Sequence, residues 1–192
     1  SLPELLELPL ARERTSYLSA YAHTYLQEEI IAEQLVRNVV PFRRFLQVAA
    51  QMNGQVVNYS KIARDVGADV TTVQQYFEIL IDTLIAMELP PYHHSVRKRQ
   101  RKNPKYYLFD LGIVRALSNS LEIPLQAETY AYGRAFEHFI ITEIHRLNEY
   151  REKRWNLSYL QSGNSAEIDL VIERTGMPLA LIEIKSATHI WE

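Results

Sequence analysis

The chain has 192 residues, of which 47% are apolar and 23% are charged. This balance excludes wholesale disorder, and the length suits one or two small domains rather than a large multidomain enzyme. The 21 basic and 23 acidic side chains give a formal charge of −2, so a nucleic-acid partner would have to meet a local patch of positive charge.

The absence of cysteine excludes disulfides, thiolate zinc sites, iron–sulfur clusters and a cysteine nucleophile. The acidic start of the chain does not resemble a signal peptide. The most apolar stretch, residues 79–89, is interrupted by Asp82 and Glu88. We therefore expect a soluble, cytoplasmic protein with no membrane partner, and the oligomeric state is left open.

Helical spacing dominates the first part of the chain. Apolar residues keep a period near 3.6 over residues 17–40, and we expect Pro41 to end this stretch. Residues 1–40 would then form a helical connector. A second helix is predicted over residues 42–52, and the Asn-Gly pair at 53–54 should end it.

Two capping signals predict a helix-turn-helix. Asn58 should cap a short helix that ends at Gly67, and Asp69 should cap a third helix over residues 70–87. A recognition helix presents polar side chains to base edges from its first turns. Here these side chains are Thr71, Thr72, Gln74 and Gln75. The alternative is a solvated polar face on a three-helix bundle.

A charged hairpin is predicted after the third helix. Residues 84–89 run into Pro90-Pro91, residues 105–109 resemble a strand, and between them six positive charges fall within nine residues. They are Arg97, Lys98, Arg99, Arg101, Lys102 and Lys105. Beside a helix-turn-helix, such a hairpin is typical of the wing of a winged helix, which neutralises phosphates. We therefore predict that residues 41–125 form a winged-helix domain that binds double-stranded DNA. The alternative is that the charged segment is a solvated or disordered loop.

A second domain is predicted over residues 126–192. Asp110 should cap a short helix over residues 111–117, and the polar residues 118–129 form a linker, with a boundary near residue 125. Beyond it we expect one amphipathic helix and three strands, over residues 133–150, 155–161, 166–173 and 179–185.

Acidic side chains of the second domain could converge on one face of this sheet. Asp169 lies on the second strand, Glu183 and Lys185 share a face of the third, and the helix carries Glu137. Their oxygens could hold Mg²⁺ or Mn²⁺, and the lysine could orient water and stabilise a phosphate, as metal-dependent phosphodiester hydrolysis requires. Glu183 and Lys185 form an acid-x-Lys triplet with the residue between them. A chain of this composition is expected to contain about 0.7 such triplets by chance, so the triplet is informative only through its place on a strand. A solvated strand face is the alternative.

Several landmarks follow one another along nearly the whole chain. They are Leu2-Pro3-Glu4, Tyr25-Leu26 with Glu28-Glu29, Val73-x-x-Tyr76 with Leu80, Pro104-Lys105-Tyr106-Tyr107 with Asp110-x-Gly112, Gly133-x-x-Phe136-Glu137, Glu167-Ile168-Asp169 and Glu183-Ile184-Lys185. Together they resemble the C-terminal portion of a large group of prokaryotic AAA-type ATPases. This portion is usually catalogued as a domain of unknown function.

The resemblance implies an α+β fold, in which a winged helix-turn-helix precedes a partial restriction-endonuclease-like domain of the PD-(D/E)XK type. It implies that four residues match the metal and catalytic positions of that superfamily, namely Glu137, Asp169, Glu183 and Lys185. It also implies an upstream ATPase module, which would bind any ATP because no Walker motif occurs in this chain. Only seven residues follow Lys185, so we expect the nuclease-like domain to be C-terminally incomplete.

Two functions follow from these expectations. The first is a DNA-binding accessory region of an AAA-type ATPase with a nuclease-like, magnesium-dependent phosphodiesterase site, that is, a metal-dependent DNA endonuclease. The second is a non-catalytic module that docks protein or DNA for the ATPase, with an inactive nuclease-like fold. Whether the chain is an enzyme is therefore left open at this point.

Overall fold

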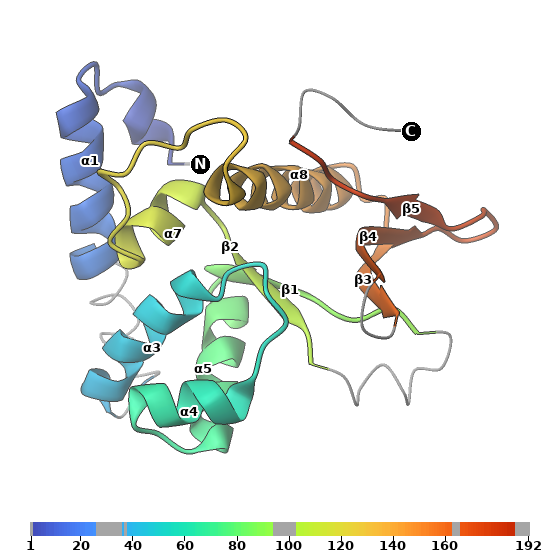
Figure 1. The fold of residues 1–192 in the computed structure, drawn as a ribbon, viewed down its shortest axis with the longest axis horizontal. Coiled ribbons are helices and arrows are strands. Elements are labelled where there is room, and N and C mark those ends of the chain that lie inside the picture. Colours follow the sequence, from blue (N-terminus) through green and yellow to red (C-terminus); the bar gives the residue numbers. More distant parts are fainter. Residues whose placement is uncertain (1, 26–35, 37, 94–102, 163–165, 187–192) are drawn as a thin grey trace. The chain divides into compact units, whose positions relative to one another are not determined.

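The computed structural model describes residues 2–25, 36, 38–93, 103–162 and 166–186. The chain divides into two compact units, Ser1–Met87 with Leu108–Pro124, and Glu88–Tyr107 with Leu125–Glu192. Helices and two small sheets make up these units, so the predicted α+β class is confirmed (Figure 1). The chain enters the second unit within strand β1 (Ala86–Leu89) and leaves it within strand β2 (Lys105–Leu108).

The first unit begins with the 3-10 helix η1 (Pro3–Leu6), the helix α1 (Ala11–Ala20) and the π-helix η2 (Tyr21–Tyr25). Helix α1 starts earlier than the predicted residue 17, because its first turns are mostly polar and give no apolar period. The predicted connector also includes residues 26–35, which lie outside the described residues.

Helix α7 (Leu111–Leu117) packs on α1 within the first unit. Its predicted cap is confirmed, because Asp110 Oδ1 accepts a hydrogen bond from Gly112 N at 2.7 Å. A side chain at Gly112 would place its Cβ 2.8 Å from a Leu18 methyl carbon. Glycine at this position therefore allows the close approach of the two helices.

Helix α3 (Val39–Gln51) corrects the prediction for Pro41. Pro41 is the third residue of this helix rather than the end of the preceding one. The first turn of a helix has backbone N–H groups without intrahelical partners, so proline is tolerated there. The helix then continues to Gln51, close to the predicted end at residue 52.

Helices α4 (Tyr59–Val66) and α5 (Val70–Asp82) pack with α3 in the first unit. Asn58 Oδ1 accepts a hydrogen bond from Lys61 N at 3.0 Å, which confirms the predicted cap of α4. Gly67 ends this helix with a φ of +74°, a left-handed conformation that glycine adopts without steric strain.

An aromatic cluster holds α3 and α5 together. The Phe45 side chain is fully buried, and its ring centroid lies 4.8 Å from that of Phe77 and 5.2 Å from that of Tyr76. Phe42 meets Tyr76 edge-on at 5.1 Å. With the fully buried Leu80, Tyr76 and Phe77 form the buried face of α5.

Helix α5 ends at Asp82, not at the predicted residue 87. Leu84 adopts a φ of +59°, and Ile85 N donates a hydrogen bond to Leu80 O at 2.8 Å, which closes the helix. A leucine takes the left-handed position that glycine usually marks, so the sequence carries no stop signal here. The chain then enters β1, which pairs with β2 in a two-stranded sheet.

Asn53 fixes the end of β2 from within the first unit. Its buried side chain accepts a hydrogen bond through Oδ1 from Leu108 N at 2.8 Å. We expect Asn53→Ala to lower the free energy of unfolding by about 1–3 kcal/mol, because a buried N–H would lose its partner. Urea denaturation measures this loss. The exposed Gln51→Ala should change stability by less than about 0.5 kcal/mol, and equal losses in both variants would contradict the assignment.

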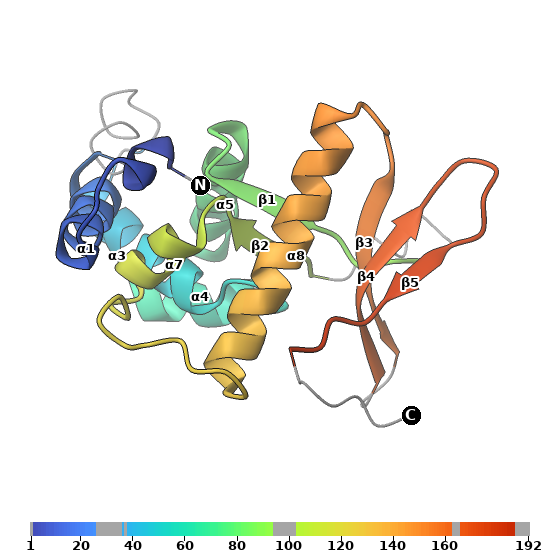
Figure 2. The same ribbon diagram turned by 90° about the horizontal axis from the view of Figure 1, so that it is seen from above.

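The second unit combines one long helix with a three-stranded antiparallel sheet. Helix α8 (Tyr130–Tyr150) begins after Thr129, whose Oγ1 accepts a hydrogen bond from Tyr132 N. The strands are β3 (Asn156–Ser162), β4 (Ala166–Glu173) and β5 (Ala180–Ile182), in the order β3-β4-β5. Figure 2 shows α8 alongside this sheet. Strand β4 has the predicted bounds, whereas β5 is shorter than the predicted residues 179–185.

Tyr159 of β3 holds the chain on both sides of the predicted basic segment. Its backbone O accepts a hydrogen bond from Tyr92 N at 2.5 Å, and its backbone N donates to Pro90 O at 3.0 Å. Its hydroxyl donates to Asn103 O at 2.6 Å. These contacts lie within the second unit, so Glu88–Tyr107 belongs with residues beyond Pro124 rather than with the helices before it.

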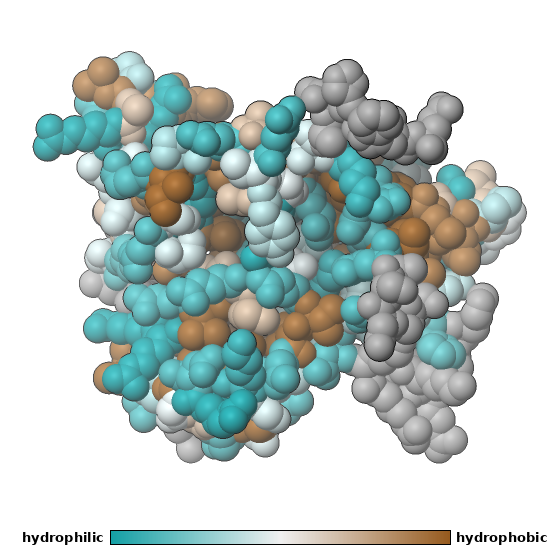
Figure 3. Space-filling model, viewed as in Figure 1, coloured by the Kyte–Doolittle hydropathy of each residue, from teal (hydrophilic) through white to brown (hydrophobic). Residues whose placement is uncertain are grey.

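Apolar side chains are exposed along β5 and the turn before it. Met177, Leu179 and Leu181 are all exposed. Figure 3 shows hydrophobic surface over this part of the molecule. In the described part of the chain, no helix combines the length and apolar character that crossing a bilayer requires.

Candidate functional site

A cavity of about 620 Å³ lies in the second unit at the N-terminus of α8. The first turns of α8, strand β4 and the segment after β5 supply its walls. Its charged and hydroxyl-bearing lining includes Glu128, Arg134, Glu137, Asp169, Lys185 and Ser186. The cavity therefore contains acidic and basic groups together.

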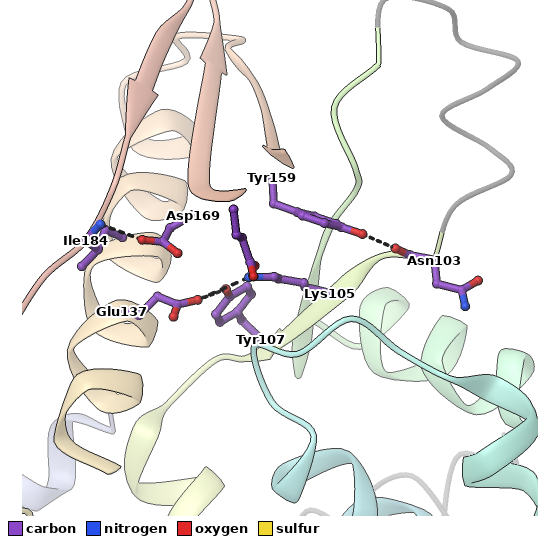
Figure 4. Close-up of polar contacts among 8 residues, drawn as sticks. Asn103, Lys105, Tyr107, Glu137, Tyr159, Asp169 and Ile184 are labelled. Atoms are coloured by element: carbon purple, nitrogen blue, oxygen red, sulfur yellow. Dashed lines mark hydrogen bonds and ion pairs between the residues drawn. The ribbon is translucent and has the colours of Figure 1, made fainter. Parts of the chain in front are cut away.

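Asp169 links β4 to the segment after β5. The ladder between these strands ends with Leu170 opposite Ile182. Beyond it, Ile184 N donates a hydrogen bond to Asp169 Oδ2 at 2.6 Å (Figure 4). The N–H of Ile184 is therefore bound by the Asp169 side chain and not by a backbone carbonyl of β4, as it would be in a longer strand. This contact explains why β5 stops before residue 185.

Lys185 and Glu183 form an ion pair at the surface, with Lys185 Nζ 2.6 Å from Glu183 Oε1. Lys185 lines the cavity, whereas Glu183 does not. The hydrogen bond to Glu183 raises the pKa of Lys185, and the charges of Glu183 and Asp169 act in the same direction. Lys185 is therefore held as a cation, which can stabilise negative charge.

Lys105 is buried in the second unit. Its Nζ lies 2.5 Å from Glu167 Oε1 and 3.6 Å from Glu137 Oε1 (Figure 4). The Tyr159 ring centroid lies 5.3 Å from the same nitrogen. An ammonium group enclosed in this way is not available to DNA, so its placement does not favour the predicted phosphate contact.

Tyr107 binds Glu137 Oε1, the oxygen that also lies near Lys105. Its hydroxyl donates a hydrogen bond to Glu137 Oε1 at 2.7 Å. Burial raises the pKa of Tyr107 well above its usual range, and the negative charge of Glu137 raises it further. The phenol therefore keeps its proton and acts as a permanent donor to Glu137.

The sequence prediction missed Tyr107 and Glu167 as parts of this site. A signal was present, because Lys105 and Tyr107 alternate on one strand and so share a face. Glu167 and Asp169 alternate in the same way on β4. Each pair also lies within one of the landmark motifs, but alternation alone does not show that the two strands contribute to one cluster.

The structure brings Glu137, Asp169 and Lys185 to one cavity but leaves Glu183 outside it. Over the described ranges, no group of three or more histidine or acidic side chains is arranged to hold a metal ion. The predicted three-acid set is thus not assembled, because the β4–β5 ladder ends before Glu183 and this side chain pairs with Lys185. Glu137 and Asp169 remain as the two carboxylates of the cavity that could hold Mg²⁺, an ion that commonly takes one or two carboxylates and keeps several waters.

The predicted recognition residues lie on the first turns of α5. Thr71, Gln74 and Gln75 are exposed. Thr72 is half-buried, and its hydroxyl donates to Asp69 Oδ2 at 2.9 Å, so it serves the helix cap. Hydrogen bonds from Thr72 also lower the pKa of Asp69. The remaining basic residues of the predicted wing lie outside the described residues, namely Arg97, Lys98, Arg99, Arg101 and Lys102.

Two family models match this chain. One is described as a domain of unknown function, DUF8612, and matches residues 1–123. The other, DUF4143, is also a domain of unknown function and matches residues 132–191.

Curated relatives occur in two mycobacteria. An uncharacterized protein of Mycobacterium tuberculosis is 25% identical over 173 residues, which cover 90% of this chain and 38% of the relative. An uncharacterized protein of Mycobacterium bovis gives the same values. The chain thus spans 38% of the length of the curated relatives it matches. No protein of solved structure matches it.

Proposed function

The chain belongs to the DUF8612 family, a domain of unknown function, and we propose that it is the DNA-binding accessory region of an AAA-type ATPase. We propose further that its second unit carries a nuclease-like phosphodiesterase site. The observation that carries this proposal is the cavity lined by Glu137, Asp169 and Lys185. Metal-dependent phosphodiester hydrolysis uses carboxylates beside a protonated lysine. The DUF4143 family is commonly associated with ATPases, which supports the first part.

Each cavity residue has a separate role in the proposed reaction. Lys185, held as a cation by Glu183, stabilises negative charge on the phosphate. Asp169 and Glu137 are each fixed through one oxygen, by Ile184 N and by the Tyr107 hydroxyl. These carboxylates would hold Mg²⁺ or Mn²⁺. When bound, the ion supplies Lewis-acid polarisation of the phosphate and activates water.

Features of the first unit, together with the basic segment of the second unit, support a role in binding double-stranded DNA. Helices α3, α4 and α5, followed by β1 and β2, have the element order of a winged helix. Exposed polar side chains on the first turns of α5 suit contact with base edges. The charge of residues 97–102 suits phosphates.

A non-catalytic docking module is the second candidate, and one observation favours it. Met177, Leu179 and Leu181 expose apolar side chains on and beside β5. Contiguous exposed apolar residues commonly mark protein–protein contacts. In this function, the second unit would hold a protein partner for the ATPase, and the cavity would not cleave DNA.

Incubation with supercoiled plasmid distinguishes these functions. We expect the chain to nick plasmid DNA in Mg²⁺ or Mn²⁺ and to leave it intact in excess EDTA. Duplex binding is measured in parallel by gel retardation. Intact plasmid together with retained DNA binding would refute the phosphodiesterase and favour the docking module, whereas loss of both would remove the DNA-binding proposal as well.

A further inference from the structure

Glu137 faces the cavity and also contacts buried side chains outside it. It lines the cavity, and through Oε1 it also contacts Lys105 and Tyr107, which do not line the cavity. The Lys105 side chain is only 4% exposed and lies between Glu137 and Glu167. A buried ammonium group is stable only when it is paired in this way. Lys105 thus places a fixed positive charge beside a carboxylate of the candidate site.

We infer that Lys105 is a positioning residue that lowers the affinity of the cavity for divalent cations, while Tyr107 keeps Glu137 in its orientation. The inference rests on the proposed function only in taking Glu137 as a cation ligand. Lys105 and Tyr107 both contact Glu137 Oε1, and we assign them opposite effects on cation affinity. Lys105 competes by charge, because an ammonium group repels a cation that approaches Glu137.

The two contacts can be separated by mutation because they differ in kind. In Lys105→Met the ammonium is lost, but the Tyr107 hydroxyl still holds Glu137 Oε1. Like charges a few ångströms apart near a protein surface repel enough to change a binding constant about tenfold or more. Lys105→Met should therefore bind a divalent cation more tightly, because it removes the positive charge and leaves Glu137 in its orientation. In Tyr107→Phe the orientation is lost while the charge remains, and removing such an outer contact commonly lowers metal affinity about 10–100-fold.

Titration of the chain with Mn²⁺ alone, followed by calorimetry, tests this inference. We expect about tenfold tighter binding in Lys105→Met, weaker binding in Tyr107→Phe, and wild-type affinity in Lys105→Arg, which keeps the charge. Circular dichroism checks that each variant folds. A folded Lys105→Met that binds Mn²⁺ no more tightly than the wild type would overturn the inference.

A further variant keeps the test decisive if Lys105→Met does not fold. Glu167→Gln removes the closer partner of Lys105 at a side chain that is 41% exposed, and it leaves the ammonium to Glu137 alone. We expect weaker Mn²⁺ binding in this variant, and unchanged affinity would overturn the inference.

The experiment also separates this inference from the proposed function. If the wild type binds no Mn²⁺ but Lys105→Met does, the metal-dependent activity fails while the role of Lys105 stands. If neither binds Mn²⁺ and both are folded, the inference fails. If the wild type binds Mn²⁺ and the variants behave as expected but plasmid stays intact, only catalysis is refuted.

Discussion

Replacement of Arg97, Arg99 and Arg101 by serine should weaken duplex DNA binding and make it less sensitive to salt. Each lost phosphate contact reduces the slope of log affinity against log salt concentration by about 0.9, so three contacts should reduce it by about 2.7. Fluorescence anisotropy at several salt concentrations measures both the affinity and the slope. A sequence-independent loss is expected, because phosphate contacts carry no base information.

A variant with the same change in charge provides the control. Arg151, Lys153 and Arg154 are exposed in the turn after α8, and their replacement by serine also removes three positive charges. We expect this variant to keep most of the salt slope. Equal losses in both triple variants would indicate a general effect of net charge and contradict a specific role for residues 97–102.

The attachment of this basic segment bears on which unit meets the phosphates. Tyr159 of β3 binds Pro90 and Tyr92 through its backbone and Asn103 through its hydroxyl. The residues on either side of the segment are thus bound by the unit that also contains the cavity. Under the proposed function, the positive charge of the segment would therefore attract DNA to the unit with the proposed phosphodiesterase site, and not only to helices α4 and α5.

Features set by local chemistry could be predicted from the sequence. The caps at Asn58, Asp69 and Asp110 are confirmed because a short polar side chain and a backbone N–H two or three residues later suffice to form them. The bounds of β4 were also predictable, since apolar residues alternate along it.

Features set by distant or unusual contacts could not be predicted. The partners of Lys105 are 32 and 62 residues away, at Glu137 and Glu167, and no local pattern links them. The end of α5 depends on a leucine in a left-handed conformation, and the end of β5 depends on the side chain of Asp169. In each case one tertiary or strained contact outweighs the propensity of the segment.

Asp169→Asn should abolish metal-dependent plasmid nicking while leaving the fold intact. The asparagine carbonyl oxygen can still accept the hydrogen bond from Ile184 N, so the segment after β5 should keep its place. The negative charge that attracts a cation is lost, and we expect the rate to fall at least about 10²–10³-fold. The initial rate of nicking in Mn²⁺, measured alongside the thermal midpoint, separates catalysis from stability.

Two comparisons make the Asp169→Asn result specific to the cavity. Asp82→Asn makes the same chemical change at the exposed end of α5, and we expect it to retain the wild-type rate. Glu137→Gln keeps an acceptor for the Tyr107 hydroxyl but loses charge, so it should lower the rate as Asp169→Asn does. Nicking that survives in both cavity variants would come from another site or a contaminant. Loss in the cavity variants alone, with unchanged DNA binding, would identify Glu137 and Asp169 as catalytic residues.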